Sequence, residues 1–144
     1  MSPNGGRPPT LRRPLRATAA ALVTIACITG CATSQRDQVK AKVEQFVTAV
    51  AAKDYKTICQ QVLSEELLLD MREGGIGCEQ ALRISLGSLK SPSLAIGPIS
   101  VNGDSASAVT LSGAKGQEAA LASLELLKTP NGWRVNALGS PLKK

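Results

Sequence analysis

The stretch FVTAVAAKDYKTICQQVLSEEL, residues 46–67, decides how the first half of this chain folds. Apolar residues recur at helical spacing from just upstream into this stretch, while charged and amide side chains take the other faces. The apolar positions are Val39, Val43, Phe46, Val47 and Val50. The pattern predicts an amphipathic helix that begins near Asp37, with Ser34 as its capping residue, and ends near Lys53.

The same stretch contains the starts of two further helices. Asp54 is placed to cap a second helix, whose apolar residues share one side. Ser64, followed by Glu65 and Glu66, combines a hydroxyl cap with acids that favour the positive end of a helix dipole. This third helix should stop at the glycine pair 74–75. The shared apolar side of the second helix comprises Tyr55, Ile58, Cys59, Val62 and Leu63.

A fourth helix is expected from Cys78 to about Leu86, with Ala81, Leu82 and Ser85 facing inward. Pro92 then ends the helical part of the chain. The first half is therefore predicted to be helical.

The second half reads as short strands joined by turns. Residues 102–104, Asn-Gly-Asp, supply the left-handed backbone that a tight hairpin requires. The composition of EAALASLELLK, residues 118–128, favours a helix, but a turn on each side predicts a strand that completes a meander. The expected strands are 94–101, 105–112, 118–128 and 133–138. The predicted fold class is α+β, with the helices packed on a four-stranded antiparallel sheet.

The N-terminus has the order of an export signal. Residues 1–16 contain four arginines and no acid, and an uncharged stretch follows over 17–28. That apolar part is about a dozen residues, whereas a helix that crosses a bilayer needs about 20. A temporary signal is therefore favoured over a permanent anchor, and both the Sec and the twin-arginine export routes stay open.

The signal ends in Ile28-Thr29-Gly30-Cys31, which resembles the bacterial lipobox. The resemblance implies that Cys31 receives a diacylglycerol and becomes the new N-terminus, while Cys27 leaves with the signal. An ordinary secretory signal with a coincidental cysteine is the alternative. The expected organisation is a signal peptide over 1–30, a lipidated tether over 31–36 and one domain over 37–144. Such a protein would be held by its lipid on the extracytoplasmic side of the cell membrane.

Two cysteines, Cys59 and Cys78, remain in the expected mature protein. Disulfides persist in exported proteins, so a bridge between them is predicted, with two buried free thiols as the alternative. A closed loop of about 20 residues would stabilise the fold by about 3 kcal/mol.

Charge and composition argue against several classes of function. The chain has 17 basic and 11 acidic residues. Four of the basic residues lie in the signal, so the mature charge is 13 minus 11, or +2. The chain has one Phe, one Tyr and one Trp, too few for a base-stacking platform, and nucleic-acid binding is not expected. It has no histidine, and neither a metal site nor a cofactor is predicted.

The order of these parts resembles the NTF2-like (nuclear transport factor 2 fold) proteins, particularly lipoprotein members of actinobacterial envelopes. The residues that carry the resemblance are Phe46, Asp54 and the tripeptide 132–134, Gly-Trp-Arg. It implies a cone in which a curved sheet wraps around the first helix and leaves a pocket at its open end. Phe46, Tyr55 and Trp133 are the candidate pocket or core residues, and Trp133 is expected mainly to anchor the core.

Some proteins of this fold are isomerases or dehydratases with an acidic or histidine base. Glu125 is the candidate here, but its neighbours Leu124 and Leu126 predict that it points outward, so no catalytic residue is assigned. The expected function is a non-catalytic, lipid-anchored envelope domain that binds a small apolar ligand or another envelope protein. A carboxylate-dependent isomerase or lyase is the alternative. The resemblance also implies a homodimer through the outer face of the sheet.

Overall fold

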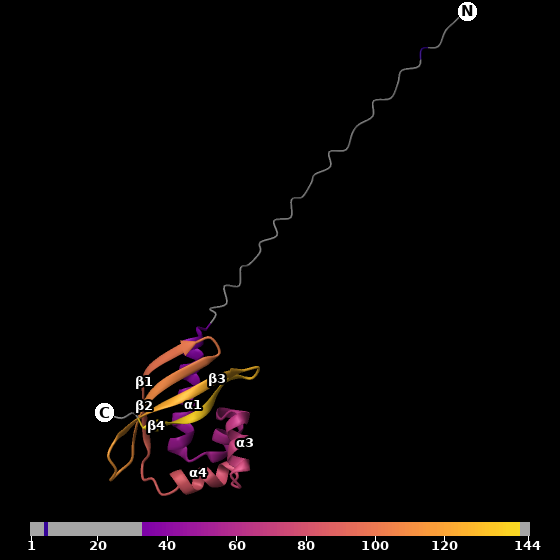
Figure 1. Ribbon diagram of the computed structural model, residues 1–144. Helices are drawn as coiled ribbons and strands as arrows, with labels where there is room; N and C mark the ends of the chain where they lie inside the picture. Colours follow the sequence, from indigo (N-terminus) through magenta and orange to yellow (C-terminus); the bar gives the residue numbers. More distant parts are fainter. Residues whose placement is uncertain (1–4, 6–32, 142–144) are drawn as a thin grey trace, which may run out of the picture. The chain divides into compact units, whose positions relative to one another are not determined.

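Helix α1 spans Gln35–Ala52 (Figure 1). It carries the apolar stripe predicted from the sequence. The structure is a computed structural model that describes Gly5 and residues 33–141, so the predicted lipidation site Cys31 lies outside the described residues. The side chain of Ser34 accepts a hydrogen bond from the Asp37 amide at 3.1 Å. Because this cap fixes the first turn, α1 begins two residues before the expected domain boundary. Its buried residues are Val39, Val43, Phe46, Ala49 and Val50.

The predicted second helix is divided into a short α-helix, α2 (Tyr55–Thr57), and a π-helix, η1 (Ile58–Val62). Asp54 caps α2 as predicted. In η1 the hydrogen bonds span five residues, and the amide of Leu63 donates to the Ile58 carbonyl at 3.0 Å. Periodicity predicts a helix here, and the structure shows that its second part is a π-helix.

Helices α3 (Glu65–Glu73) and α4 (Cys78–Leu86) start at the predicted positions. Helix α3 has no fully buried side chain, and α4 buries only Leu82. The prediction that Ser85 faces inward is wrong: Ser85 is exposed, and its hydroxyl donates to the Ala81 carbonyl at 2.8 Å. A serine satisfied within its own helix has no need of a partner in the core.

The strands form an antiparallel meander in the order β1-β2-β3-β4. Their bounds are Ser93–Asn102, Ser105–Gly113, Ala120–Thr129 and Gly132–Pro141. The alanine-rich and leucine-rich third segment is a strand, as predicted against its helix propensity. Gly103 and Gly132, both with positive φ, close the first and last hairpins. Register shifts within β1 and between β3 and β4 bend the sheet, which curves over α1 (Figure 1).

The core lies between α1 and the inner face of the sheet. Leu124 and Leu126 of β3 alternate onto this face, and Trp133 and Val135 of β4 join them. The junction between η1 and α3 is fixed to the same strand, because the Ser64 amide donates to the Val135 carbonyl at 2.8 Å. This bond holds the start of α3 against β4.

Candidate functional site

Large side chains fill the space between α1 and the sheet. Phe46, predicted as a pocket or core residue, is a core residue, and so is Trp133, which is 2% exposed. Trp133 Nε1 is buried without a hydrogen-bond partner. Tyr55 is half-buried at the edge of the core, with the Arg83 guanidinium 5.9 Å from its ring centroid. These three aromatic residues therefore serve packing in this structure.

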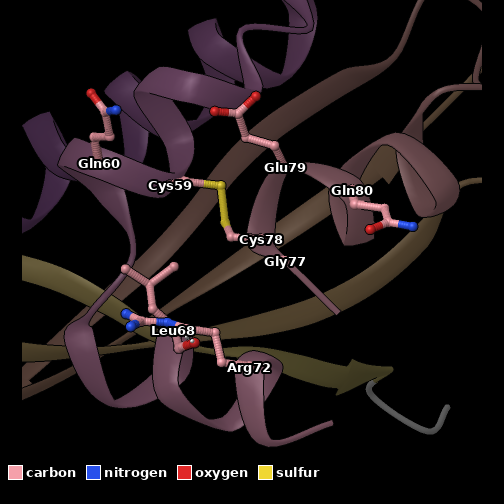
Figure 2. Close-up of a pocket in the computed structure, with 8 residues that line it drawn as sticks. All are labelled: Cys59, Gln60, Leu68, Arg72, Gly77, Cys78, Glu79 and Gln80. Carbon is pink, nitrogen blue, oxygen red and sulfur yellow. Dashed lines mark hydrogen bonds between the residues drawn. A yellow bond between two sulfur atoms is a disulfide. The ribbon is translucent and has the colours of Figure 1, made fainter. Parts of the chain in front are cut away.

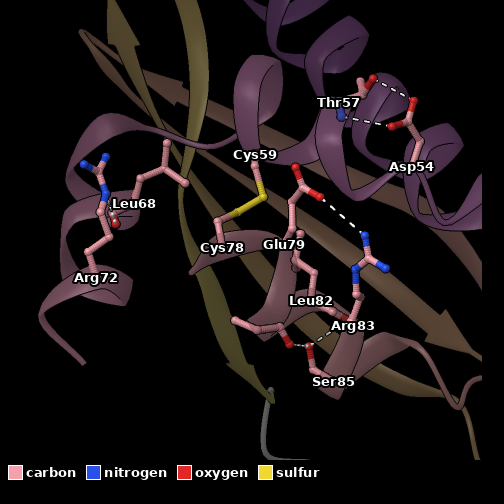
Figure 3. The surroundings of a disulfide bond; sticks show 11 residues. Asp54, Thr57, Cys59, Leu68, Arg72, Cys78, Glu79, Leu82, Arg83 and Ser85 are labelled. Atoms are coloured by element: carbon pink, nitrogen blue, oxygen red, sulfur yellow. Dashed lines mark hydrogen bonds and ion pairs between the residues drawn. A yellow bond between two sulfur atoms is a disulfide. The ribbon is translucent and has the colours of Figure 1, made fainter. Parts of the chain in front are cut away.

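A disulfide joins η1 to α4. Cys59 is buried and Cys78, the first residue of α4, is half-buried (Figures 2 and 3). Their Cα atoms are 6.0 Å apart, within the usual range for a disulfide. The predicted pairing is confirmed, and the alternative of two free thiols does not hold in this structure.

The disulfide forms one wall of a surface hollow of about 530 Å³, which we call the disulfide hollow (Figure 2). Figure 2 shows Leu68 and Arg72 of α3 across from the start of α4. The lining residues are Cys59, Gln60, Leu68, Arg72, Gly77, Cys78, Glu79 and Gln80. The wall is thus contributed by three short helices.

A second hollow of about 490 Å³ lies between α3 and the turn that joins β3 to β4, and we call it the arginine hollow. Arg72 of α3 and Arg134 of β4 both line it. Its apolar lining residues are Leu63, Leu68 and Pro130. Its polar lining residues are Gln60, Glu65, Thr129 and Asn131.

A third hollow of about 420 Å³, the Leu69 hollow, shares Glu65, Thr129 and Pro130 with the arginine hollow. Leu69 and Leu127 also line it. The arginine and disulfide hollows in turn share Gln60, Leu68 and Arg72. Three adjoining hollows therefore run around α3, and we call them together the α3 groove.

The position of α3 is set by one buried serine. Ser64 caps the helix by accepting from the Leu67 amide at 3.1 Å, and its hydroxyl donates to Asn136 Oδ1 of β4 at 2.6 Å. A single side chain thus begins α3 and ties it to the sheet, which fixes the wall of the groove.

Positive charge gathers beside the groove, at the end of η1. Arg134 Nη1 donates to the Gln60 carbonyl at 3.3 Å, and Lys42 Nζ donates to the Gln61 carbonyl at 2.9 Å. The end of a helix offers unpaired carbonyls that favour cations. Partial burial lowers the pKa of Lys42, and the charge of Arg134 lowers this pKa further.

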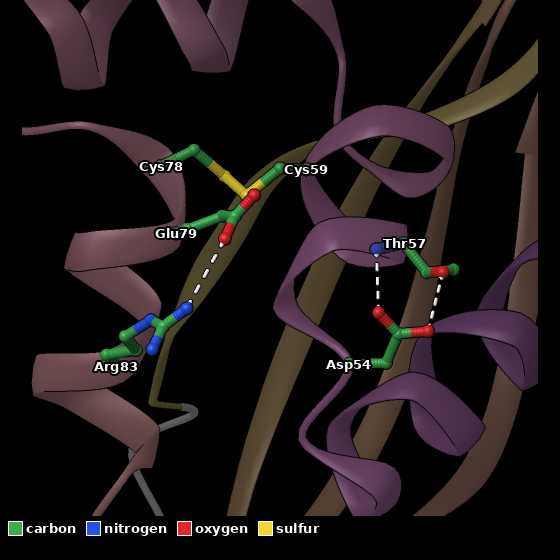
Figure 4. A network of polar contacts seen from close by, with 6 residues as sticks. All are labelled: Asp54, Thr57, Cys59, Cys78, Glu79 and Arg83. Atoms are coloured by element: carbon green, nitrogen blue, oxygen red, sulfur yellow. Dashed lines mark hydrogen bonds and ion pairs between the residues drawn. A yellow bond between two sulfur atoms is a disulfide. The ribbon is translucent and has the colours of Figure 1, made fainter.

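Every Asp and Glu side chain of the chain is exposed. The 11 acidic residues all lie within the described residues, and none is even half-buried. Glu125 points to the outer face as predicted and accepts from the Ser123 hydroxyl at 2.8 Å. The hydroxyl and the amide of Thr57 hydrogen-bond to Asp54 at 2.7 and 3.0 Å and lower the pKa of this carboxyl (Figure 4). Glu79 pairs with Arg83 at 3.5 Å on α4.

Within residues 33–141, His, Cys, Asp and Glu side chains nowhere form a group of three that could hold a metal ion. No helix in this part of the chain combines the length and the apolar character needed to cross a membrane.

The sequence pattern does not predict the α3 groove. Arg134 belongs to the Gly-Trp-Arg tripeptide named above, but no local pattern marks Arg72 as a functional residue. The two arginines lie far apart in the chain, and only the packing of α3 beside the last hairpin brings them to one hollow.

Comparison with protein-family models and with the sequences of curated proteins gives no match. A crystal structure from Streptomyces avermitilis, provisionally described as a dehydratase of the NTF2-like family, is similar to this chain with a TM-score of 0.53. The two are 19% identical, and the match covers 76% of this chain and 96% of the other. Together with the four helices and the curved antiparallel meander, this likeness identifies the fold of the described domain as NTF2-like.

Proposed function

We propose that this chain is a lipid-anchored, non-catalytic domain of the bacterial cell envelope that binds another envelope protein through the α3 groove. The observation that carries the proposal is the groove itself, whose wall combines leucines and a proline with two arginines. Apolar surface beside a few well-placed polar groups is the usual composition of a recognition site. The export signal and the lipidated Cys31 that the sequence predicts support a location outside the cytoplasm, and the disulfide suits an oxidising compartment.

The packed interior favours a protein partner over a small apolar ligand. Phe46, Leu126 and Trp133 are buried between α1 and the inner face of the sheet, and none of them lines the three hollows described above. Protein interiors pack at high density, and emptying such a space would cost several kcal/mol. The hollows around α3 lie at the surface, where a segment of a partner can reach them.

The exposed carboxylates support a role without catalysis. A general base that works near neutral pH commonly has its pKa raised by burial. Here Glu125 lies on the outer face, and the pKa of Asp54 is lowered. The dehydratase description of the similar structure favours the alternative of an isomerase or lyase. Loss of biological function in a folded Glu125→Gln variant would favour that alternative.

The outer face of the sheet supports a further proposal, a homodimer. Leu111 and Leu121 form a cross-strand pair there and are 42% and 45% exposed. Analytical ultracentrifugation of wild type and Leu121→Ser would test it, since a dimer through this face should dissociate in the variant.

Site-specific photo-crosslinking in the native host tests the binding role. A photoreactive amino acid would replace Leu69, which is 45% exposed and lines the groove, or Ile84, which is 68% exposed on α4 and does not line it. The expected result is one crosslinked envelope protein from position 69 and none from position 84. Equal crosslinking at both positions, or a lipid that the purified acyl-free domain retains non-covalently in native mass spectrometry, would contradict the proposal.

Labelling with an alkyne fatty acid tests the anchor. Wild type should incorporate the label and fractionate with membranes, and Cys31→Ala should do neither. A wild-type protein that stays unlabelled and is found in the cytosol would contradict the proposed membrane location.

A further inference from the structure

The arginine hollow brings together hydrogen-bond donors from α3, β4, η1 and the turn between β3 and β4. Arg72 comes from α3, Arg134 from β4, and the amide side chains of Gln60 and Asn131 from η1 and the last turn. Each guanidinium uses one nitrogen on a neighbouring carbonyl: Arg72 Nε donates to Leu68 and Arg134 Nη1 to Gln60, both at 3.3 Å. A guanidinium has five N–H donors, so both keep free donors.

Neither arginine is neutralised within the domain. The ion pairs among residues 33–141 are Lys40–Glu44 and Arg83–Glu79, and both lie on single helices. Glu65 also lines the hollow but forms no ion pair there, and it lies in the first turn of α3, where the helix dipole favours its charge. The hollow therefore contains two cations and one carboxylate, Glu65, and its net charge is positive.

Lys42 adds a third cation next to Arg134. Both donate to carbonyls at the end of η1, and the lowered pKa of Lys42 reflects burial together with the charge of Arg134. Like charges held close together raise the energy of the free domain, and a bound anion would relieve this repulsion. The site is thus electrostatically complementary to a negative group.

We infer that the arginine hollow binds a carboxylate carried by an extended acidic segment of the partner protein. The inference rests on the proposed function and names the chemistry that the partner presents. A guanidinium matches a carboxylate through two parallel hydrogen bonds. Leu63, Leu68 and Pro130 line the same hollow, and the groove continues on both sides along α3. An elongated, partly apolar groove fits a peptide chain better than a compact ion.

Fluorescence anisotropy with a labelled peptide tests the inference on the disulfide-bonded domain. The probe is a hexapeptide of alternating aspartate and leucine, and the same peptide with asparagine in place of aspartate is the control ligand. Arg72→Gln and Arg134→Gln should each weaken binding about tenfold, the effect of losing one charge-assisted hydrogen bond. Arg83→Gln removes the same charge from α4 outside the hollow and should change binding less than about twofold.

Changes at Arg72 keep the result interpretable if Arg134→Gln fails to fold. Arg134 bonds to η1, so Arg134→Gln can affect folding, whereas Arg72 is exposed and bonds only within its own helix. Arg72→Lys keeps the charge but not the planar fork, and it should recover only part of the affinity. Thermal unfolding of each variant shows whether its fold is retained.

Several results would overturn the inference. Equal losses of affinity in Arg72→Gln and Arg83→Gln would show that only overall charge matters. Equal affinity for the asparagine peptide would show that the hollow does not recognise a carboxylate. Displacement of the peptide by inorganic phosphate or by phosphatidylglycerol vesicles at comparable concentrations would assign the hollow to phosphate. If the crosslink from position 69 persists in Arg72→Gln, the proposed function stands and the carboxylate inference fails. If wild type gives no crosslink at all, the proposed function itself fails.

Discussion

Ser64→Ala should be the most informative single change in the domain, because Ser64 both caps α3 and ties it to β4. Loss of the cap to the Leu67 amide costs about 1 kcal/mol. Loss of the bond to Asn136 costs about 1 to 2 kcal/mol more, since the Asn136 amide oxygen would keep no partner in a half-buried position. The expected total is about 2 to 3 kcal/mol.

For a domain of about 110 residues, 1 kcal/mol corresponds to about 4 °C in Tm, so Ser64→Ala should unfold about 8 to 12 °C below wild type. Far-UV circular dichroism during thermal and urea unfolding measures the shift. Ser34→Ala is the matched control, because Ser34 caps α1 in the same way but is exposed. Ser34→Ala should lower the free energy of unfolding by about 1 kcal/mol.

Equal shifts in the Ser64 and Ser34 variants would refute this reasoning, because the tie to Asn136 would then contribute nothing. A double-mutant cycle with Asn136→Ala separates the two contributions, and the coupling between positions 64 and 136 should be about 1 kcal/mol.

Three further predictions concern the bridge, the core and a surface carboxylate. Replacing Cys59 and Cys78 with serine should lower the free energy of unfolding by about 3 kcal/mol, measured in urea, and an unchanged midpoint would show that the bridge is dispensable. Trp133→Ala should lower the free energy of unfolding by about 3 to 5 kcal/mol. Trp133→Phe should lower it much less, because the buried indole Nε1 has no hydrogen-bond partner to lose, and equal losses in the two variants would contradict this account. Hydrogen bonds from Thr57 lower the pKa of Asp54. The stability that the Asp54 carboxylate contributes is therefore present above about pH 4 and is lost as the pH falls through the pKa of Asp54 in the folded state. Unfolding midpoints from neutral to acidic pH should therefore decline less in Asp54→Asn than in wild type, and parallel curves would count against this role.

Local pattern was enough to predict most of the fold. The apolar stripe around Phe46 predicted α1, and the serine and aspartate caps predicted where α2 and α3 start. The strand β3 was predicted against its composition because a turn signal lies on each side of it, and Leu124 and Leu126 do alternate onto the inner face. Each of these signals lies within a few residues of the element that it predicts.

The remaining features depend on contacts between distant segments. The π-helical turn places one extra residue before Leu63, and no periodicity in such a short segment distinguishes it from an α-helix. The arginine hollow needs α3 and the last hairpin to meet, which local pattern does not reveal. For Phe46, Tyr55 and Trp133 the sequence predicts a place in either the pocket or the core, and the structure places Phe46 and Trp133 in the core. Aromatic side chains serve either role, and only the full set of neighbours decides between them.

The absence of fully buried side chains on α3 has a consequence for how this region behaves in solution. Its apolar residues Leu67, Leu68 and Met71 are only partly buried against the core, so α3 should open locally at a lower free energy than α1, whose inner face is buried throughout. Its amides should then exchange with deuterium well before those of α1, while the disulfide keeps α4 attached to η1. A partner that docks on α3 would slow this exchange, so its footprint could be mapped by mass spectrometry before the partner itself is identified.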